Sequence, residues 1–269
     1  MNNAIIIGTG KIGIDLYIKL KKNNIFNKVF IFNTNKLSEG AKYCQKKKFL
    51  YYDTGVKGIK KKLNSCNVIF DCTSANSNIL ITKELKNLIK NKFYINLTPS
   101  TFGKYVVPYF NQQTIPNEVN LITCGGQTSI PIISLFKKIL GVNLVYSELV
   151  SSISSKSAGV ATRNNINEYI INTENAIKQI AKIKKTKVII NLNPSIPPVN
   201  MMNSLFFEFK KSIKKKVYVN LKKELKKINS QIKFYIPDYN ATMFKGFDEK
   251  VLRVTVRVIG QGDYLPTYA

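Results

Sequence analysis

Residues 4–22, AIIIGTGKIGIDLYIKLKK, decide the first part of the fold. AIIIG predicts a short buried strand, and residues 12–22 have the apolar spacing of a helix that ends in lysines. Between them, Gly8, Gly10 and Gly13 fit the pattern G-x-G-x-x-G. Gly8 permits a tight turn, Gly10 lets a pyrophosphate group approach, and Gly13 allows close packing of helix and strand. An ordinary strand–turn–helix is the alternative, and the strand and helix on either side favour dinucleotide binding.

The pattern of this stretch continues along the first half of the chain. Further buried strands are predicted at 28–32, 68–72, 93–97 and 119–123, and helical segments such as 79–90 lie between several of them. Strands that alternate with helices predict an α/β fold with a doubly wound parallel sheet of the Rossmann type.

After about residue 130 the pattern changes. Longer strands are predicted at 144–154, 186–192 and 251–259, and helices at 165–183 and 217–228. The alternation of VLRVTVRVI suits a half-buried antiparallel strand. We therefore predict a dinucleotide-binding domain at 1–130 and a second α+β domain, with a mixed or antiparallel sheet, at 131–269.

Composition excludes several classes of protein. The 269 residues include no apolar run near the roughly 20 residues that a membrane span needs. The four cysteines do not have the spacing of a zinc site, so no metal site is predicted. The glycine-rich N-terminus is unlike a signal peptide. Without an export signal, we expect a cytoplasmic protein whose thiols are reduced. The net charge of +27 invites a nucleic-acid interpretation, but only three of the 42 basic residues are arginine and the lysines are dispersed. Solvated faces are the better interpretation.

Asn33 follows the predicted strand 28–32, where an acidic residue would bind the adenosine ribose of NAD. An asparagine can still bond a hydroxyl, but it lacks the charge that would repel a 2′-phosphate. The preference for NAD over NADP is therefore left open.

A second motif is TCGGQTSIP at 123–131. We expect a strand to end at Thr123 and a helix to begin near Gly125 or Gly126. A thiol at a helix start, such as Cys124, would have a stabilised thiolate, and the N–H groups of Gly125 and Gly126 could hold an oxyanion. A buried structural thiol is the alternative. Because the chain has no histidine, Ser-His-Asp and Cys-His arrangements are excluded.

A third motif, SSISSKSAGVATRNNINEY at 151–169, places Ser157, Ala158 and Gly159 before Arg163 and a predicted helix. A small-residue loop at a helix start is a second place for a cofactor, and an exposed polar helix cap is the alternative.

Together these motifs resemble the acylating acetaldehyde dehydrogenases that pair with 4-hydroxy-2-oxovalerate aldolases in aromatic catabolism. GTGKIGIDLYIK, FDCTSA, NLTPS, NLITCGGQTSIP, SISSKSAG, TRNNINEY, IINLNPSIPP and YLPTYA resemble that family's blocks in order, over nearly the whole chain. CGGQ followed by SKSAG is the most specific part of the resemblance.

The resemblance implies an NAD-dependent oxidation of acetaldehyde with coenzyme A as co-substrate. Cys124 would attack the aldehyde, hydride transfer would leave a thioester on Cys124, and coenzyme A would take the acyl group. It also implies a homodimer and an aldolase partner. The cofactor-binding residues that it implies are Thr9, Gly10, Lys11, Ile12, Ser157, Ala158, Gly159, Val160, Ala161, Thr162, Arg163, Asn164 and Asn165.

The chain departs from the family pattern at three places. Asn203 stands where the family has an aspartate with a proposed acid–base role, and an amide accepts no proton at neutral pH. Val160 and Ala161 replace a Pro-Gly pair, and the sequence ends at YLPTYA where the family continues with a cofactor-contacting asparagine. These departures favour a reduced activity.

Three alternatives remain open. The chain could be a weakened homologue that serves as the structural partner of an aldolase, which the departures favour and the intact TCGGQ opposes. It could be a phosphorylating semialdehyde dehydrogenase of similar two-domain build, although the histidine usual in such enzymes is missing. A nucleic-acid binder is supported by charge alone.

Overall fold

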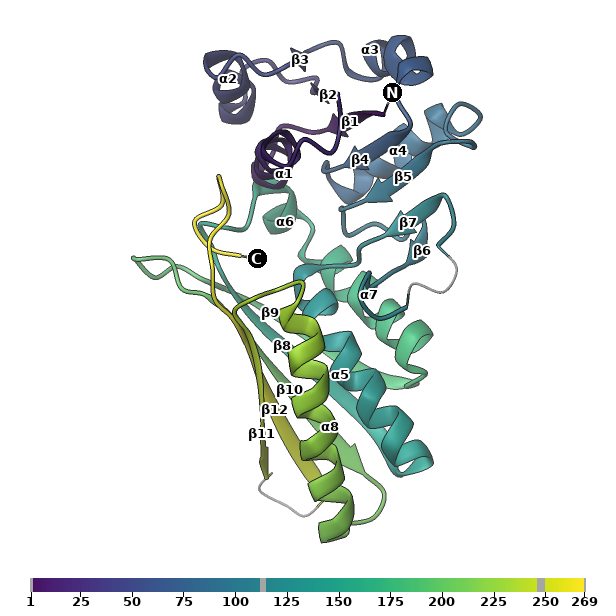
Figure 1. Cartoon of the computed structure of the whole chain (residues 1–269), viewed down its shortest axis with the longest axis vertical. Helices are drawn as coiled ribbons and strands as arrows, with labels where there is room; N and C mark the ends of the chain where they lie inside the picture. The colour runs from purple at the N-terminus through teal and green to yellow at the C-terminus, as the bar shows by residue number, and fades with distance from the viewer. Residues whose placement is uncertain (1, 112–114, 246–249, 269) are drawn as a thin grey trace.

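The computed structural model describes residues 2–111, 115–245 and 250–268 (Figure 1). The first sheet consists of β1 (Asn3–Ile7), β2 (Lys28–Phe32), β3 (Tyr51–Tyr52), β4 (Val68–Asp71), β5 (Phe93–Asn96), β6 (Lys104–Tyr105) and β7 (Glu118–Asn120). The strands lie in the order β3-β2-β1-β4-β5-β7-β6, and every pair is parallel. The order runs outward in both directions from β1 and β4, which confirms the doubly wound parallel sheet.

Helices cover both faces of this sheet. They are α1 (Lys11–Lys22), α2 (Glu39–Lys46), α3 (Gly55–Lys62), the 3₁₀ turn η1 (Leu63–Ser65) and α4 (Ala75–Leu85). Successive residues of a strand face opposite sides, so Ile6 packs in the cluster with Ile14 of α1, while Ile5 packs with Ile59 of α3 and Leu85 of α4. The α4 helix begins earlier than predicted because the Ser74 hydroxyl caps it.

The second sheet has five strands: β8 (Leu144–Ser154), β9 (Lys185–Asn193), β10 (Met201–Phe209), β11 (Tyr239–Lys245) and β12 (Val251–Val258). Their order is β11-β12-β10-β8-β9, with β8 and β9 parallel and the other pairs antiparallel. The predicted second α+β region with a mixed sheet is therefore confirmed. Its central strand, β10, was not predicted.

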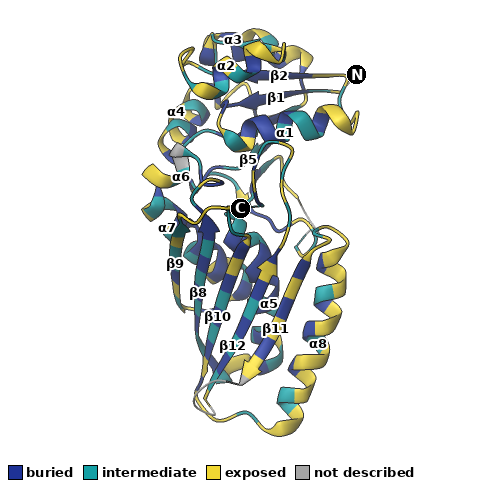
Figure 2. Cartoon of the chain, turned by 90° about the vertical axis from the view of Figure 1, so that its left-hand side faces the viewer, coloured by how far each residue is buried: buried dark blue, intermediate teal, exposed yellow. Residues whose placement is uncertain are grey.

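Helices cover one face of the second sheet. The elements of this part are α5 (Cys124–Leu140), the 3₁₀ turn η2 (Gly141–Asn143), α6 (Val160–Asn164), α7 (Ile166–Ala176), the π-helical turn η3 (Ile177–Ala181) and α8 (Lys215–Lys233). Figure 2 shows the opposite face of the sheet open, with α5 behind the strands and α8 beside β11. None of the described helices is long and apolar enough to cross a membrane.

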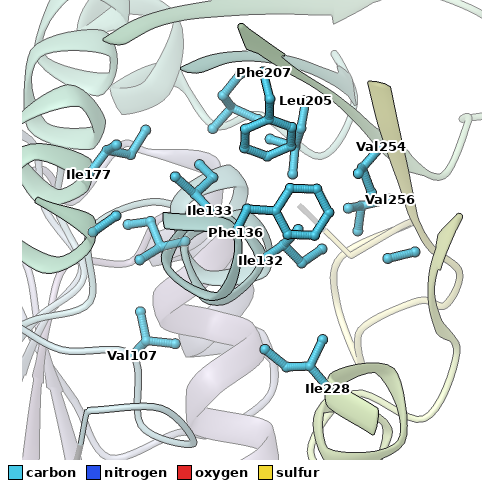
Figure 3. Packing of buried hydrophobic residues seen from close by; sticks show 14 of the residues in the cluster. Val107, Ile132, Ile133, Phe136, Ile177, Leu205, Phe207, Ile228, Val254 and Val256 are labelled. Atoms are coloured by element: carbon cyan, nitrogen blue, oxygen red, sulfur yellow. The ribbon is translucent and has the colours of Figure 1, made fainter. Parts of the chain in front are cut away.

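The core of the second part is built on α5. In Figure 3, Phe136 of α5 lies among side chains of β10 and β12, and its ring is 4.7 Å from that of Phe207 between centroids. Ile130 and Ile133 belong to the same buried cluster. The predicted boundary after residue 130 lies inside this helix, so we propose that the second domain begins with α5 at Cys124.

The C-terminal segment connects the two parts. The buried carboxylate of Asp15 in α1 accepts hydrogen bonds from the N–H groups of Tyr264 and Leu265 at 2.7 and 3.2 Å. A few residues later, the Thr267 hydroxyl is 2.6 Å from that of Ser157 in the loop after β8. Residues 264–267 therefore cross from α1, beside the first sheet, to the small-residue loop after β8.

Candidate active site

Three polar residues end neighbouring strands of the first sheet at the same level. Asp71, Asn96 and Asn120 are partners in the register of β4, β5 and β7, and all three side chains are fully buried. Each side-chain oxygen accepts a hydrogen bond from the N–H two residues further along. These N–H groups belong to Thr73, Thr98 and Ile122, at 2.9, 2.8 and 2.7 Å. The three strands thus end in the same kind of turn, and their loops leave toward one edge of the sheet.

The turn after Asn120 delivers the thiol. Ile122 has φ +62°, a left-handed conformation that is strained for a β-branched residue. Its N–H is held by Asn120, and its carbonyl accepts a hydrogen bond of 3.1 Å from the buried Asn172 amide of α7. The predicted strand end at Thr123 is therefore wrong: β7 ends at Asn120 because the asparagine side chain replaces the next strand bond.

Helix α5 begins at Cys124, slightly before the predicted start near Gly125 or Gly126, and its first N–H groups are already bonded. The N–H of Gly126 donates to the Thr123 hydroxyl at 3.1 Å, and the N–H of Gly125 donates to the Tyr169 hydroxyl at 3.2 Å. The oxyanion site predicted at Gly125 and Gly126 would therefore require these bonds to be exchanged. Glycine is required at 125, because a Cβ there would lie 2.5 Å from the Tyr169 oxygen.

Sequence reasoning missed Tyr169, which lies at the thiol. Its hydroxyl is 3.8 Å from Cys124 Sγ and donates to the Ser151 hydroxyl at 3.4 Å. The tyrosine belongs to α7 and the serine to β8, so the contact joins three elements. The tyrosine ended the third motif, but nothing in the sequence connects it with a cysteine 45 residues earlier.

The expected low pKa of Cys124 is wrong for the protein without ligands. Burial raises the pKa of this thiol, while hydrogen bonds from Tyr169 and the Gly125 N–H oppose the rise. Burial also raises the pKa of the other thiols, in the case of Cys44 to about 12. Cys124 differs in access, because it is half-buried while Cys44, Cys66 and Cys72 are buried.

Cys124 lines a small cavity between the two parts of the molecule. Apolar and hydroxyl side chains surround it: Ile12, Leu97, Pro99, Ile122, Thr123, Ile153, Ser157, Ala158, Thr162, Tyr169 and Leu265. No charged side chain is among these described lining residues. Such a lining suits a small, uncharged and partly apolar molecule.

The glycine-rich turn has the geometry predicted for it. Gly8 has φ +103°, and a Cβ on Gly13 would lie 2.1 Å from the Gly8 carbonyl oxygen, so α1 packs directly against the turn. Gly10, the N-cap of α1, differs: a Cβ there would have only the Cys72 oxygen near it, at 3.9 Å. The turn thus packs tightly against α1 at Gly13, whereas Gly10 leaves space beside the backbone.

A large cavity of about 2370 Å³, open to solvent, lies in front of this turn. It shares lining residues with the small cavity, among them Ile12, Leu97 and Thr162. The predicted cofactor residues that line it are Gly8, Thr9, Gly10, Lys11, Ile12, Asn33, Gly159, Thr162, Asn164 and Asn165. The two segments predicted to hold a cofactor therefore face one cavity.

The remaining predicted cofactor residues lie around that cavity. Ser157 and Ala158 line the small cavity, and Arg163 donates a hydrogen bond to the Ser155 carbonyl. Val160 and Ala161 belong to α6, but their side chains lie outside the part of the chain that the structure describes. Gly13 is not among the described residues that line either cavity. Its lack of a side chain lets helix α1 and the glycine-rich turn pack closely.

Asn33 lies at the end of β2, where sequence analysis placed it, and its amide is fully engaged. The NH₂ group donates to the Thr9 hydroxyl at 2.6 Å and to the Ser38 hydroxyl at 3.2 Å, and the oxygen accepts from the Thr34 N–H at 2.8 Å. The same hydroxyl of Ser38 caps α2. Asn33 therefore also shapes the wall of the cavity.

Lys11 lines the large cavity, and the Arg163 charge lies close to Lys11 without being among the described lining residues. Lys11 donates to the Lys156 carbonyl, and both burial and the neighbouring Arg163 charge lower the pKa of Lys11. The Glu39 carboxylate acts in the opposite direction. Two neighbouring cations beside a helix start form a place where anionic phosphate groups are favoured.

Asn203 is not among the described residues that line either cavity. It lies on β10 with its side chain fully buried against α5, where its NH₂ group donates to the hydroxyls of Thr128 and Ser129 at 2.8 and 3.2 Å. Within the part of the chain that the structure describes, its oxygen has no hydrogen-bond partner. Thr128 in turn donates to the carbonyl of Cys124 at 3.0 Å. The geometry thus gives Asn203 an indirect connection to the thiol, through α5.

Comparison with known proteins identifies the family. Residues 124–266 match the family model described as the dimerisation region of prokaryotic acetaldehyde dehydrogenase. The acetaldehyde dehydrogenase of Bacillus cereus is 34% identical over 268 residues, which cover 99% of this chain and 87% of the relative. That of Pectobacterium atrosepticum is 35% identical over 268 residues and is covered to 88%.

Solved structures share the fold. Aspartate semialdehyde dehydrogenase II of Vibrio cholerae aligns over 96% of this chain and 93% of its own, with a TM-score of 0.64 and 9% identity. The enzyme of Francisella tularensis aligns over 99% and 96%, with a TM-score of 0.61 and 12% identity. Identities this low show a common two-part architecture alone.

These findings agree with the motifs and with the arrangement of the thiol and the glycine-rich turn. The match to a dimerisation region supports a homodimer. Membership of a dehydrogenase family implies a nicotinamide cofactor. The chain belongs to the prokaryotic acetaldehyde dehydrogenases, a family of oxidoreductases that act on aldehydes.

Proposed function

We propose that this chain oxidises acetaldehyde or another short aldehyde with NAD and passes the acyl group through Cys124 to coenzyme A. The observation that carries the proposal is the position of Cys124 at the start of α5, in an uncharged cavity that adjoins the cavity of the glycine-rich turn. A thiol nucleophile suits this reaction because the thioester it forms can be displaced by a second thiol.

In this proposal, Cys124 Sγ forms a bond to the aldehyde carbon, and the carbonyl oxygen takes a proton to give a thiohemiacetal. Gly10, Lys11 and Gly159 line the large cavity and would hold a nicotinamide cofactor, which would supply the hydride acceptor for that carbon. Loss of the hydroxyl proton leaves an acyl thioester on Cys124. The thiol of coenzyme A then adds to the thioester carbonyl, the bond to Cys124 breaks, and the proton returns to the Cys124 thiolate.

The two cavities support such a sequence of steps because they meet at Ile12 and Thr162. An aldehyde held beside Cys124 would therefore lie next to the cofactor cavity, because both spaces share these lining side chains. Ile153 and Leu97 provide an apolar surface for a short alkyl group. Exclusion of water by these side chains would protect the thioester from hydrolysis.

The residues present fit a dinucleotide. Gly10 is open toward the cavity, and a Cβ on Gly159 would meet nothing within 4 Å, so both stretches of backbone allow close approach. Lys11 and Arg163 would favour phosphate groups, which NAD and coenzyme A both carry. Asn33 replaces the charged ribose ligand, so affinity for NAD and for NADP should be compared directly.

The proposal is tested by capture of the acyl-enzyme. Isotopically labelled acetaldehyde and NAD, mixed with the protein without coenzyme A, should leave a label on Cys124 that peptide mass spectrometry locates. Addition of coenzyme A should release the label as acetyl-CoA. Samples without NAD are the matched control and should keep no stable label. A label on another residue, or none, would contradict the covalent route.

The other functions considered above receive less support. A semialdehyde substrate that carries charged groups would need a counter-charge, and no charged side chain is among the described residues around the thiol. Asn203 lies outside that lining, so its amide is weak support for an inactive structural homologue. The aldolase partner and the cytoplasmic location stay predictions.

We propose that the homodimer forms through the open face of the second sheet. Every second residue of β10, such as Ser204 and Phe206, turns away from the helices, and Figure 2 shows this face uncovered. Arg253 of β12 lies over the Phe244 ring at 4.7 Å on the same sheet. A mixed polar and apolar sheet face suits a second copy of the chain, and the match to a dimerisation region supports that partner. Phe206→Glu should shift the mass measured by sedimentation toward the monomer.

A further inference from the structure

Tyr169 lies between the thiol and the start of α5. Its ring is buried, with 4% of its surface exposed, and its hydroxyl is 3.8 Å from Cys124 Sγ. The hydroxyl accepts a hydrogen bond from the Gly125 N–H at 3.2 Å, so its own proton is left for a second partner. The acceptors within its reach include the sulfur and the Ser151 hydroxyl.

The thiol has few other sources of stabilisation. Among the described residues around the small cavity, Cys124 and Tyr169 are the titratable ones. The charged side chains Lys11 and Glu39 line the large cavity instead. No histidine exists in the chain. Burial works against the charged form of the sulfur and raises the pKa of Cys124. A thiolate formed there depends on hydrogen-bond donors.

We propose that Tyr169 is a catalytic residue: its hydroxyl, polarised by the Gly125 N–H, donates a hydrogen bond to the Cys124 thiolate and prepares it for attack. This inference rests on the proposed role of Cys124 as the nucleophile. As the sulfur bonds to the aldehyde carbon it loses its negative charge, and the hydroxyl can return to Ser151. The Gly125 N–H thus acts on the sulfur through the tyrosine as well as directly.

The chemistry of the phenol supports a donor and excludes a base. Burial and the neighbouring Cys124 both raise the pKa of Tyr169 well above its usual value. The hydroxyl therefore keeps its proton at any pH at which the enzyme would work. A hydrogen bond to a charged group is worth more than one between neutral groups, so its loss should be measurable.

The test compares Tyr169→Phe with wild type. The variant keeps the buried ring and removes only the hydroxyl. The rate of Cys124 alkylation by iodoacetamide, followed by peptide mass spectrometry against pH, gives the pKa of the thiol. We expect it to rise by about one unit or more. We expect kcat for aldehyde oxidation to fall roughly 10- to 100-fold, with little change in the KM for aldehyde.

Two further variants separate this role from a structural one. Tyr239 also has a buried ring and donates to a carbonyl of α5, that of Thr128, at 2.8 Å. Tyr239→Phe should leave the thiol pKa and kcat unchanged, and an equal change there would overturn the proposal. Ser151→Ala removes the competing acceptor and should lower the thiol pKa. A rise would count against the proposal.

The outcomes also distinguish this inference from the proposed function. If wild type acquires the acyl label on Cys124 and Tyr169→Phe has the wild-type thiol pKa and kcat, the tyrosine has no such role and the covalent route stands. If wild type acquires no label, the covalent route fails. The thiol pKa of Tyr169→Phe then still reports whether the hydroxyl stabilises the sulfur.

Discussion

Two helix starts bound the site, and they are built differently. The turn from β1 into α1 has Gly10 as its N-cap, and no side chain caps the helix. The turn from β7 into α5 has Thr123 as its N-cap, and the first N–H groups donate to hydroxyls of Thr123 and Tyr169. Both are glycine-rich turns that follow a strand of the same sheet.

The difference in capping indicates which kind of group each turn presents or binds. An uncapped helix start in front of a large cavity leaves its positive end available to the phosphates of a ligand. A capped start has used its donors within the chain, and what it presents is the side chain of its first residue, Cys124. A glycine-rich turn before a helix thus predicts a close approach, but it does not tell whether the approaching group is a ligand or the protein itself.

The largest expected effect is a loss of aldehyde oxidation when the thiol of the α5 turn is removed. Cys124→Ser should lower aldehyde oxidation roughly 1000-fold or more, because a hydroxyl is a far poorer nucleophile than a thiolate and the chain has no histidine to activate it. Affinity for NAD, measured by calorimetry, should stay within about twofold. A large loss of affinity in this variant would show that the α5 turn also binds the cofactor.

The reciprocal change tests the open turn. A Cβ at Gly10 would have no atom nearer than 3.9 Å, so Gly10→Val should fold normally and place its side chain toward the cavity. NAD affinity should fall about 10- to 100-fold because the pyrophosphate cannot approach. The alkylation rate of Cys124 without NAD should be unchanged. Equal NAD affinity in variant and wild type would exclude this turn as the cofactor site.

How far the sequence predicts these turns depends on what holds them. Local patterns were sufficient for β2 and β8, which begin and end at the predicted residues. They were also sufficient for Gly8 and Gly13, whose spacing reflects the geometry of one turn. Tyr169 was not predictable, since only the packing of α7 against α5 brings it to the thiol.

The other failures have equally physical causes. Strand β10 was missed because MMNSLFFEF has no regular alternation of polar and apolar residues, although burial in the structure does alternate. Asn203, inside that strand, was assigned to the catalytic site from the family resemblance, and its contact with Thr128 connects it to the Cys124 main chain only indirectly. The strain at Ile122 was not predictable either, because isoleucine rarely adopts a positive φ and the distant Asn172 side chain helps the local Asn120 to hold it there.

A third prediction tests whether the capped turn is also a strained one. Asn172→Ala leaves the Ile122 carbonyl and the Tyr105 hydroxyl without their buried partner, since Tyr105 donates to Asn172 at 2.9 Å. Unfolding in urea should show a loss of about 2 kcal/mol. Relaxation of the turn should also lower the alkylation rate of Cys124 severalfold.

Asn229 offers a control for this variant. Its amide bonds the main chain of Ala241 at 2.8 and 3.0 Å, far along the second sheet from the thiol. Asn229→Ala should lose a similar free energy of unfolding while Cys124 keeps its alkylation rate. If Asn172→Ala lowered the free energy of unfolding but left the alkylation rate of Cys124 unchanged, Asn172 would stabilise the fold without orienting the thiol.

The smallest expected effect concerns the cap itself. Thr123 Oγ1 accepts the Gly126 N–H and lies 2.8 Å from the Thr173 hydroxyl of α7. Thr123→Ala should lower the free energy of unfolding by about 1 kcal/mol, the usual cost of losing an N-cap. Thr123→Ser restores the oxygen and should recover most of the loss, as urea unfolding would show.

The alanine variant also frees the Gly126 N–H, so it should bind anions such as sulfate at the thiol better than wild type. Unchanged stability and anion affinity would mean that the two helix starts differ less than their hydrogen bonds indicate.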